Sequence, residues 1–303
     1  MDYHVIIVGG SYAGISAGLQ LARARRRVLV IDAAERRNRF AETSHGFLGQ
    51  DGRSPAHIAD EARDQLLAYP TVEWRADTAI DAGKDAEGFW LSTRAGQRHR
   101  ARRLILATGV VDELPEVEGL AARWGKSVFH CPYCHGYELA GGPIGVLATS
   151  QLSMHQALML PDWGATTLFI NDAFVPDAEQ LASLARRGVR VEREPVRRIV
   201  GDKAEMVLAD GRVIAAEGLF VVPRTRMASP LAGLLGCEFE EGPLGAFIKT
   251  DPTRETSVPG VFACGDAATA FSSVAIAVGD GAKTGAGTHR SLIFGLAPVQ
   301  GAG

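Results

Sequence analysis

The sequence is poor in cysteine, in excess charge and in long hydrophobic runs, and each shortage excludes a class of protein. Four cysteines among 303 residues are too few for a small domain held together by disulfides. Lys and Arg number 32 and Asp and Glu 35, so the sequence offers no strongly basic surface for a nucleic acid or a membrane. No run reaches the roughly 18 apolar residues that a transmembrane helix needs.

The N-terminal residues also lack the features of an export signal. Met1–His4 has no basic n-region, and the apolar run Val5–Val8 is shorter than the hydrophobic part of a signal peptide. We therefore expect a cytoplasmic protein. Glycine, by contrast, is abundant, with 35 residues. Without a collagen repeat, such abundance is typical of tight turns that approach a ligand.

Two stretches follow the same plan of strand, turn, helix and strand. The elements of the first copy are predicted at 5–8, 15–25 and 28–31, and it ends at Asp32. Those of the second copy are predicted at 144–147, 153–160 and 167–170. This repeat predicts an α/β fold with two Rossmann-like, doubly wound dinucleotide-binding domains, the second inserted in the first. Proline-containing seams at 114–115 and 242–243 indicate a first domain at 1–114 and 243–303 and an inserted domain at 115–242.

The turn after the first strand is typical of a pyrophosphate-binding loop. It reads Gly9-Gly10-Ser11-Tyr12-Ala13-Gly14, a G-x-G-x-x-G pattern in which Ser11 replaces the middle glycine. Gly9 permits the turn and Gly14 allows close packing of helix and strand, while the first N–H groups of the helix face a pyrophosphate. Asp32 is then placed to accept hydrogen bonds from a ribose. The alternative is a turn that binds no ligand.

A second motif, Gly260–Asp266, lies near the C-terminus. A short strand ends in Gly265-Asp266, and a helix is predicted over 272–282. In flavoproteins with two dinucleotide domains, such an Asp holds the ribityl chain of FAD and the helix directs its N-terminal dipole at the flavin. The alternative is a plain strand–turn–helix. Further candidate contacts to the cofactor are Asn38, His45, Thr108, Gly109, Ser273 and Val274.

Cys131 and Cys134 form a C-x-x-C pattern at a predicted helix start. Two thiols at this spacing can close a disulfide, and a helix dipole lowers a thiol pKa. Zinc needs two further ligands, and neither Cys237 nor Cys264 has a paired neighbour, so we expect no metal site. His135 directly follows the second cysteine and can carry a proton to or from a thiolate. Inert buried thiols and an exposed loop histidine are the alternatives.

These motifs occur in the same order in the low-molecular-weight thioredoxin reductases, which this sequence resembles over nearly its whole length. The likeness rests on the G-G-S-Y-A-G turn, A-T-G at 107–109, C-x-x-C-H-G-Y-E at 131–138 and G-V-F-A-C-G-D at 260–266. It implies an FAD-containing homodimer in which Cys131 exchanges with substrate and Cys134 lies against the flavin. Thioredoxin reductases have Asp at the position of His135. The C-x-x-C-H form is similar to the dithiol oxidases of gliotoxin- and holomycin-type biosynthesis.

The middle domain departs from the reductase pattern where NADPH binds. NADPH-using reductases carry a Gly-rich turn there, and a His-Arg-Arg cluster for the 2′-phosphate. Here the turn reads Ala148-Thr149-Ser150, and the cluster position reads Ile170-Asn171-Asp172. Side chains at the turn obstruct the approach of a pyrophosphate, and the charge of Asp172 repels a phosphate. We therefore do not expect NADPH as a cofactor.

The sequence thus predicts an FAD-dependent thiol–disulfide oxidoreductase that oxidises a dithiol through Cys131 and Cys134, with oxygen or another electron acceptor. Two alternatives stay open. One is a disulfide reductase driven by NADPH or by a donor such as ferredoxin, and the other is a flavin redox sensor that acts without turnover. The expected partner is a dithiol or disulfide substrate, either a small molecule or a thioredoxin-like protein.

Overall fold

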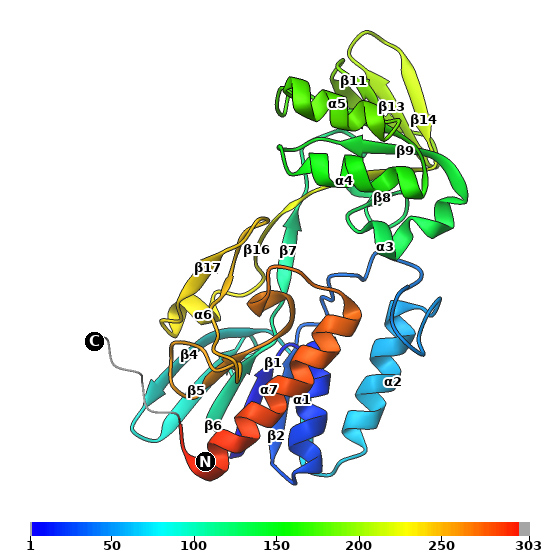
Figure 1. Cartoon of the computed structure of the whole chain (residues 1–303). Coiled ribbons are helices and arrows are strands. Elements are labelled where there is room, and N and C mark those ends of the chain that lie inside the picture. Colours follow the sequence, from blue (N-terminus) through cyan, green and yellow to red (C-terminus); the bar gives the residue numbers. More distant parts are fainter. Residues whose placement is uncertain (1, 297–303) are drawn as a thin grey trace. The chain divides into compact units, whose positions relative to one another are not determined.

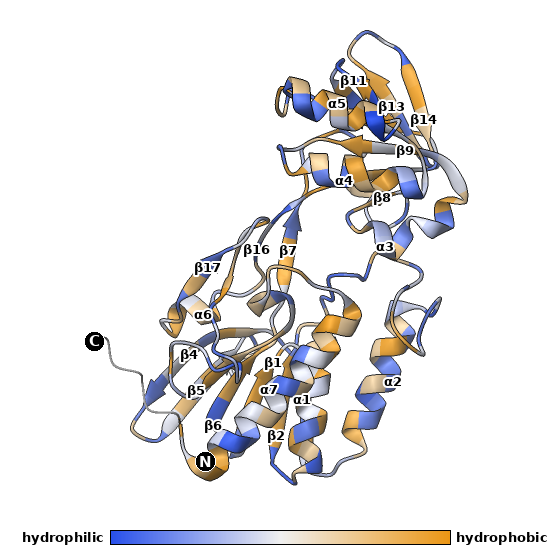
Figure 2. Ribbon diagram, viewed as in Figure 1, coloured by the Kyte–Doolittle hydropathy of each residue, from blue (hydrophilic) through white to orange (hydrophobic). Residues whose placement is uncertain are grey.

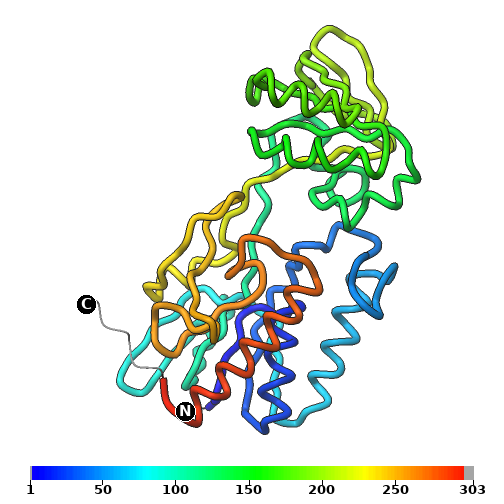
Figure 3. The backbone as a smooth tube through the Cα atoms, in the orientation of Figure 1, coloured from blue at the N-terminus to red at the C-terminus, as the bar shows by residue number. Residues whose placement is uncertain are grey.

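The computed structural model describes residues 2–296 (Figure 1). Contacts within the chain divide it into two compact units. Unit 2 comprises Asn38–Pro55 and Asp112–Arg224, and unit 1 comprises the other described residues. Figure 3 traces residues 112–224, coloured from teal to yellow, as one uninterrupted part of the backbone.

Unit 1 is built on a mainly parallel sheet. Its strands are β1 (Tyr3–Val8), β2 (Val28–Asp32), β3 (Val72–Ala76), β4 (Ala79–Asp85), β5 (Gly88–Thr93), β6 (Arg98–Leu106) and β19 (Val261–Ala263). They lie in the order β3-β2-β1-β6-β5-β4, with β19 also paired to β6. Neighbours among β1, β2, β3, β6 and β19 run parallel, whereas β4 and β5 continue the sheet as antiparallel strands. The carboxyl ends of β1, β2 and β19 therefore lie at one edge of the sheet.

The helices of unit 1 are α1 (Tyr12–Arg23), α2 (Pro55–Leu67), α6 (Leu231–Leu234) and α7 (Val274–Phe294). Helix α1 begins at Tyr12, earlier than the predicted residue 15, because Ile15 N already donates to Ser11 O. Helices α1 and α7 pack side by side (Figure 1). A Cβ on Gly281 would lie 2.1 Å from Ala13 O, so only glycine allows this approach.

Unit 2 contains a parallel sheet and a smaller antiparallel one. The parallel sheet has the order β11-β10-β9-β15-β8, with β8 (Val128–Phe129), β9 (Gly141–Leu147), β10 (Gly164–Phe169), β11 (Arg190–Glu192) and β15 (Gly218–Val221). The antiparallel sheet consists of β12 (Val196–Val200), β13 (Ala204–Leu208) and β14 (Val213–Ala216). The helices are α3 (Pro132–His135), α4 (Ser153–Met159) and α5 (Ala178–Arg186).

The central strand β9 is buried on both faces. Val146 packs with Phe129 and Leu168 on one side, and Leu147 packs with Phe169 on the other. A parallel strand covered on both faces explains the continuous apolar run in the sequence. By contrast, α2 and α5 carry both hydrophilic and hydrophobic residues (Figure 2), as expected for helices with one exposed face. The predicted α/β fold with two Rossmann-like domains is confirmed.

The chain leaves unit 1 in β7 (Val110–Glu113) and returns in β16 (Arg224–Met227), and these two strands pair. The return comes earlier than the predicted boundary at residue 242. Residues after β16 belong to unit 1 because Leu231 and Ala232 lie in its hydrophobic core. The following strands β17 (Phe239–Glu241) and β18 (Ala246–Ile248) form an antiparallel pair in the same unit. Among residues 2–296, no helix is long and apolar enough to cross a membrane.

Candidate active site

The turn that joins β1 to α1 has the geometry of a cofactor cradle. Gly9 has a φ of +103°, and a Cβ there would lie 2.2 Å from Ala107 O. A Cβ on Gly14 would lie 1.9 Å from Gly9 O. The backbone of the turn is therefore packed against residue 107 and against the first turn of α1. Neither position can carry a side chain, so the close packing of strand, turn and helix requires glycine at both.

Polar groups converge on this turn. Asp32 lies at the end of β2, and its Oδ1 accepts a hydrogen bond from Gly10 N at 3.0 Å. Ser11 is the N-cap of α1, and its side chain accepts no hydrogen bond from the N–H groups of the first helical turn. An anion is stabilised at such a helix start by the N–H groups and the dipole. These residues fit the pyrophosphate and ribose of a dinucleotide.

Asp266 lies in the turn that follows β19. Its Oδ2 accepts a hydrogen bond from Arg37 Nη1 at 2.8 Å, and its Oδ1 accepts one from Ser272. The preceding residue, Gly265, has a φ of +68° and donates its N–H to Asp280 on α7 at 2.9 Å. The turn that carries Asp266 is thus held from α7 as well as from the segment after β2.

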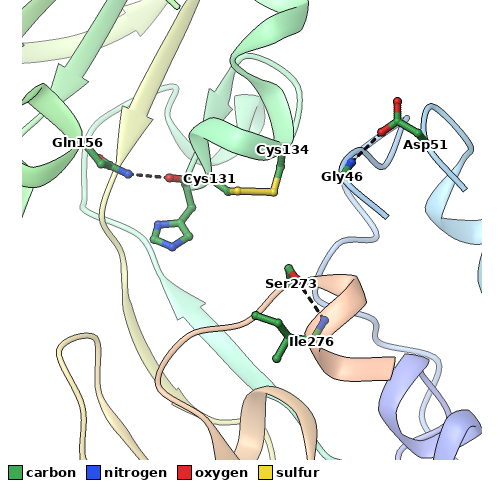
Figure 4. The surroundings of a disulfide bond; sticks show 8 residues. Gly46, Asp51, Cys131, Cys134, Gln156, Ser273 and Ile276 are labelled. Atoms are coloured by element: carbon green, nitrogen blue, oxygen red, sulfur yellow. Dashed lines mark hydrogen bonds between the residues drawn. A yellow bond between two sulfur atoms is a disulfide. The ribbon is translucent and has the colours of Figure 1, made fainter. Parts of the chain in front are cut away.

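The start of α7 follows this turn. Ser273 is its N-cap, and the Oγ of Ser273 accepts from Ile276 N at 3.2 Å (Figure 4). The structure brings most of the predicted cofactor contacts into unit 1, namely Gly9, Ser11, Gly14, Asp32, Thr108, Gly109, Gly265, Asp266, Ser273 and Val274. The other two, Asn38 and His45, belong to unit 2.

Cys131 and Cys134 form a disulfide with a Cα–Cα distance of 5.3 Å (Figure 4). Cys131 is the N-cap of α3 and Pro132 is its first residue, a position that suits proline. Helix α3 has only four residues, so its dipole is small and lowers a thiol pKa less than the sequence suggested. The segment before Cys131 is anchored from α4, where Gln156 Nε2 donates to His130 O at 2.6 Å (Figure 4).

His135 ends α3 and packs on an aromatic residue of the parallel sheet. Its ring stacks on Phe129 with centroids 4.4 Å apart and an interplanar angle of 18°. Burial lowers the pKa of His135 from 6.5 to about 4, the charge of Glu138 raises it, and a charge on His45 lowers it further. His135 is therefore neutral at pH 7 while the disulfide is closed. A thiolate formed nearby would raise the pKa, so its imidazole becomes a better proton acceptor when exchange begins.

The remaining cysteines are unsuited to redox chemistry. Cys237 and Cys264 are both buried. Burial raises the pKa of the Cys264 thiol to about 12, and it also raises that of Cys237. Thiols with raised pKa values are poor nucleophiles. Within the described part of the chain, no three His, Cys, Asp or Glu residues are grouped so that they could hold a metal ion.

In the turn after β9, Thr149 is hydrogen-bonded through both its side chain and its backbone N–H. Thr149 Oγ1 donates to Val222 O at 2.8 Å, and Thr149 N donates to Ser153 Oγ at 3.1 Å. The Thr149 N–H group is thus bonded inside the chain, as the Gly10 N–H group is at the first turn. Beyond β10, Asn171 Oδ1 accepts from Val196 N at 2.9 Å and ties the loop to β12. This turn differs from the first one in its side chains, because Ala148 and Thr149 follow β9 where Gly9 and Gly10 follow β1.

Comparison with known proteins assigns the chain to a family. The model of the pyridine nucleotide-disulphide oxidoreductase family matches residues 3–281. The chain belongs to this family. It is 34% identical to the thioredoxin reductase tcpT of Claviceps purpurea, over 96% of this chain and 94% of that protein. It is 30% identical to the thioredoxin reductase sirT of Leptosphaeria maculans, over 95% and 93%. A crystal structure of an oxidoreductase from Agrobacterium tumefaciens has a TM-score of 0.94 and 56% identity, covering 97% of this chain and 99% of that one.

Membership of the pyridine nucleotide-disulphide oxidoreductase family confirms the resemblance to thioredoxin reductases. The chain is an oxidoreductase that acts on sulfur groups, and the family implies FAD as its cofactor. The cradle around Gly9, Asp32 and Asp266 fits that cofactor. The sequence analysis missed Asp280 and Glu138. Asp280 interrupts the otherwise apolar stretch 274–282, and Glu138 belongs to the C-x-x-C-H-G-Y-E motif, so both had a signal in the sequence.

Proposed function

We propose that the protein oxidises a dithiol to a disulfide through Cys131 and Cys134, with FAD bound to unit 1 and oxygen as the final acceptor. In the first step a substrate thiolate attacks one sulfur of the Cys131–Cys134 disulfide and displaces the other as a thiolate. The second substrate thiol then attacks the mixed disulfide. The substrate leaves as a disulfide, and the protein keeps two electrons as a cysteine pair.

Each residue has a separate task in this reaction. Cys131 caps α3 and exchanges with the substrate. Cys134 is the sulfur displaced as a thiolate, and it passes the electron pair on to the flavin. His135 takes a proton from an attacking thiol, since only the thiolate is nucleophilic. Bound FAD supplies a two-electron acceptor, held by Gly9, Gly14, Asp32 and Asp266, and molecular oxygen is reduced to hydrogen peroxide.

The observation that supports oxidation over reduction is the position of Thr149. Its side chain and N–H are both engaged inside the chain, with Val222 O and with Ser153 Oγ. A nicotinamide dinucleotide needs a glycine at this turn so that its pyrophosphate can approach the backbone, and the Thr149 side chain occupies this position. Asp172, on the loop after β10, adds a negative charge where the 2′-phosphate of NADPH needs a positive one. Electrons are therefore better supplied by a dithiol than by NADPH.

The test is an anaerobic comparison of two electron donors in a stopped-flow spectrometer. The flavin absorbance should bleach with dithiothreitol and should stay unchanged with NADPH for minutes. After admission of air, the dithiothreitol reaction should consume oxygen and form peroxide over many turnovers. Bleaching by micromolar NADPH within milliseconds would instead support the reductase, and bleaching by dithiothreitol without repeated oxygen turnover would support the sensor.

Two further expectations follow from the family resemblance. The substrate is a small dithiol or a thioredoxin-like protein, and the active form is a cytoplasmic homodimer. Light scattering of the purified flavoprotein measures the mass of the assembly, and a mass of one chain would exclude the dimer. Turnover with a small dithiol and with reduced thioredoxin, at equal thiol concentration, separates the two substrate classes.

A further inference from the structure

The short turn Gly265–Ala268, which follows β19, is held at both ends by charged side chains. At its start, Gly265 N donates to Asp280 Oδ2 at 2.9 Å. At its end, Ala268 O accepts from Arg254 Nη1 at 3.4 Å. The other terminal nitrogen of Arg254, Nη2, forms an ion pair with Asp280 Oδ1. A single ion pair thus connects the two ends of the turn.

The ion pair lies inside unit 1. The side chain of Asp280 is 3% exposed and that of Arg254 is 22% exposed. An ion pair loses its hydration when it is buried, so an apolar pair of similar size is often at least as stable. The stability of the fold therefore gives no reason for charges at this place. The two hydrogen bonds to the ends of the turn do give one.

The backbone of Arg254 is itself in an unusual conformation. Its φ is +70°, in the left-handed region that residues other than glycine and asparagine rarely adopt. Arg254 N donates to Asp251 O at 3.0 Å, and Arg254 O accepts from Ala263 N, in β19, at 3.1 Å. The guanidinium is also bound to Thr250 Oγ1 at 3.2 Å. Such strain persists where the surrounding contacts determine it, often beside a functional site.

We propose that Arg254 and Asp280 are positioning residues that fix the turn 265–268 in the conformation that binds FAD. This role rests on the part of the proposed function in which unit 1 binds FAD. Asp266 is the second residue of the turn, so the direction of its carboxylate depends on the course of this backbone. Hydrogen bonds from backbone groups to charged partners are stronger than those between neutral groups. Arg254 and Asp280 act through the backbone, and Asp266 makes the contact to the cofactor.

The first test separates positioning from stability. Arg254→Met alone leaves the Asp280 carboxylate buried without its partner and should destabilise the protein. Adding Asp280→Leu removes the second charge and should restore the urea midpoint toward that of the wild type, but the turn keeps neither of its two bonds. After flavin removal, fluorescence titration should therefore give an FAD dissociation constant on the order of tenfold or more above the wild-type value in both variants. A wild-type dissociation constant in the double variant would overturn the proposal.

The matched control is Arg103→Met. Arg103 lies on β6, and its Nε donates to Ser291 Oγ, near the end of α7, at 2.9 Å. This variant also removes an arginine that is bound to α7, but it does not touch the turn 265–268. It should lower the urea midpoint and leave the FAD dissociation constant unchanged. If Arg103→Met weakens FAD binding as much as Arg254→Met does, general loosening of α7 explains the effect and the proposal is wrong.

The second test needs neither bound flavin nor a large substitution. Asp280→Asn keeps the shape of the side chain, but its neutral oxygen is a weaker acceptor for Gly265 N. By NMR of the FAD-free protein, the Gly265 amide should exchange with solvent faster than in the wild type, relative to the neighbouring Cys264 amide, which donates to Leu106 O. An unchanged ratio of the two exchange rates would refute the bond to Asp280. A wild-type protein that binds no FAD would overturn the proposal too, whereas failure of the dithiol reaction alone would leave these measurements valid.

Discussion

His135 stacks on Phe129, with ring centroids 4.4 Å apart. Phe129 is the last residue of β8 and His135 is the last residue of α3, so the contact binds the end of the redox helix to the parallel sheet of unit 2. Stacking fixes the imidazole ring and removes part of its hydration. The residue proposed as the proton acceptor is consequently held in its neutral form until a thiolate appears beside it.

The pKa of His135 predicts how stability depends on pH. In the unfolded chain its pKa is about 6.5, and in the folded chain burial lowers it to about 4. Between these values the unfolded chain binds more protons, so folding stability is lost as the pH falls from about 6.5 to 4, by at most about 3 kcal/mol. Urea unfolding of wild type and His135→Gln at pH 7 and pH 4.5 measures this loss, which should be smaller in His135→Gln than in the wild type. The exposed His57→Gln variant is the control, and an equal loss in wild type and His135→Gln would contradict the prediction.

The two cysteines should differ in their spectra. Cys131→Ser leaves Cys134 as the free thiol, and the family resemblance predicts that this thiol lies against the flavin. We expect a long-wavelength charge-transfer band in Cys131→Ser and no such band in Cys134→Ser, measured by absorbance between pH 6 and 9. The band should grow with pH because the thiolate is the electron donor. A band in Cys134→Ser alone would reverse the assignment of the two roles.

Loss of Asp266 should release the cofactor. Its carboxylate is oriented by Arg37 and Ser272, and Asp266→Ala removes the acceptor that the ribityl chain of FAD needs. The ratio of flavin to protein absorbance should fall at least tenfold on purification, with the far-UV circular dichroism preserved. Asp64→Ala, at an exposed position on α2, serves as the control and should keep its flavin. A yellow Asp266→Ala protein would show that this carboxylate is not required.

The position directly after α3, Gly136, has no room for a side chain. A Cβ there would lie 2.7 Å from Pro132 O and equally close to Trp163 Cδ1, so alanine forces α3 and the indole apart. We expect Gly136→Ala to lower the free energy of unfolding by about 1 to 3 kcal/mol. Gly279→Ala on α7 meets nothing within 4 Å and should be neutral or stabilising by up to about 1 kcal/mol. Urea unfolding of both variants measures the two free energies of unfolding. A Gly136→Ala protein as stable as Gly279→Ala would show that a side chain at residue 136 is tolerated.

Much of the fold was readable from the sequence because its signals are local. A glycine turn between an apolar strand and a helix fixes a βαβ unit within about 30 residues, and the same plan occurs twice. The disulfide is equally local, since Cys131 and Cys134 share one turn of chain. The domain boundary was less readable. Residues 225–242 lie in unit 1 because Leu231 and Ala232 complete its core, and core membership depends on the whole sheet.

The sequence by itself determined the α/β plan, the cofactor turn at Gly9–Gly14 and the redox pair, since each depends on residues that are neighbours along the chain. Only the tertiary structure decided that His45 meets Glu138, that Arg37 meets Asp266, and that Thr149 closes the second turn. The partners in these pairs are separated by 73 to 229 residues. Their meeting is set by the packing of strands and helices between them, which no local spacing encodes.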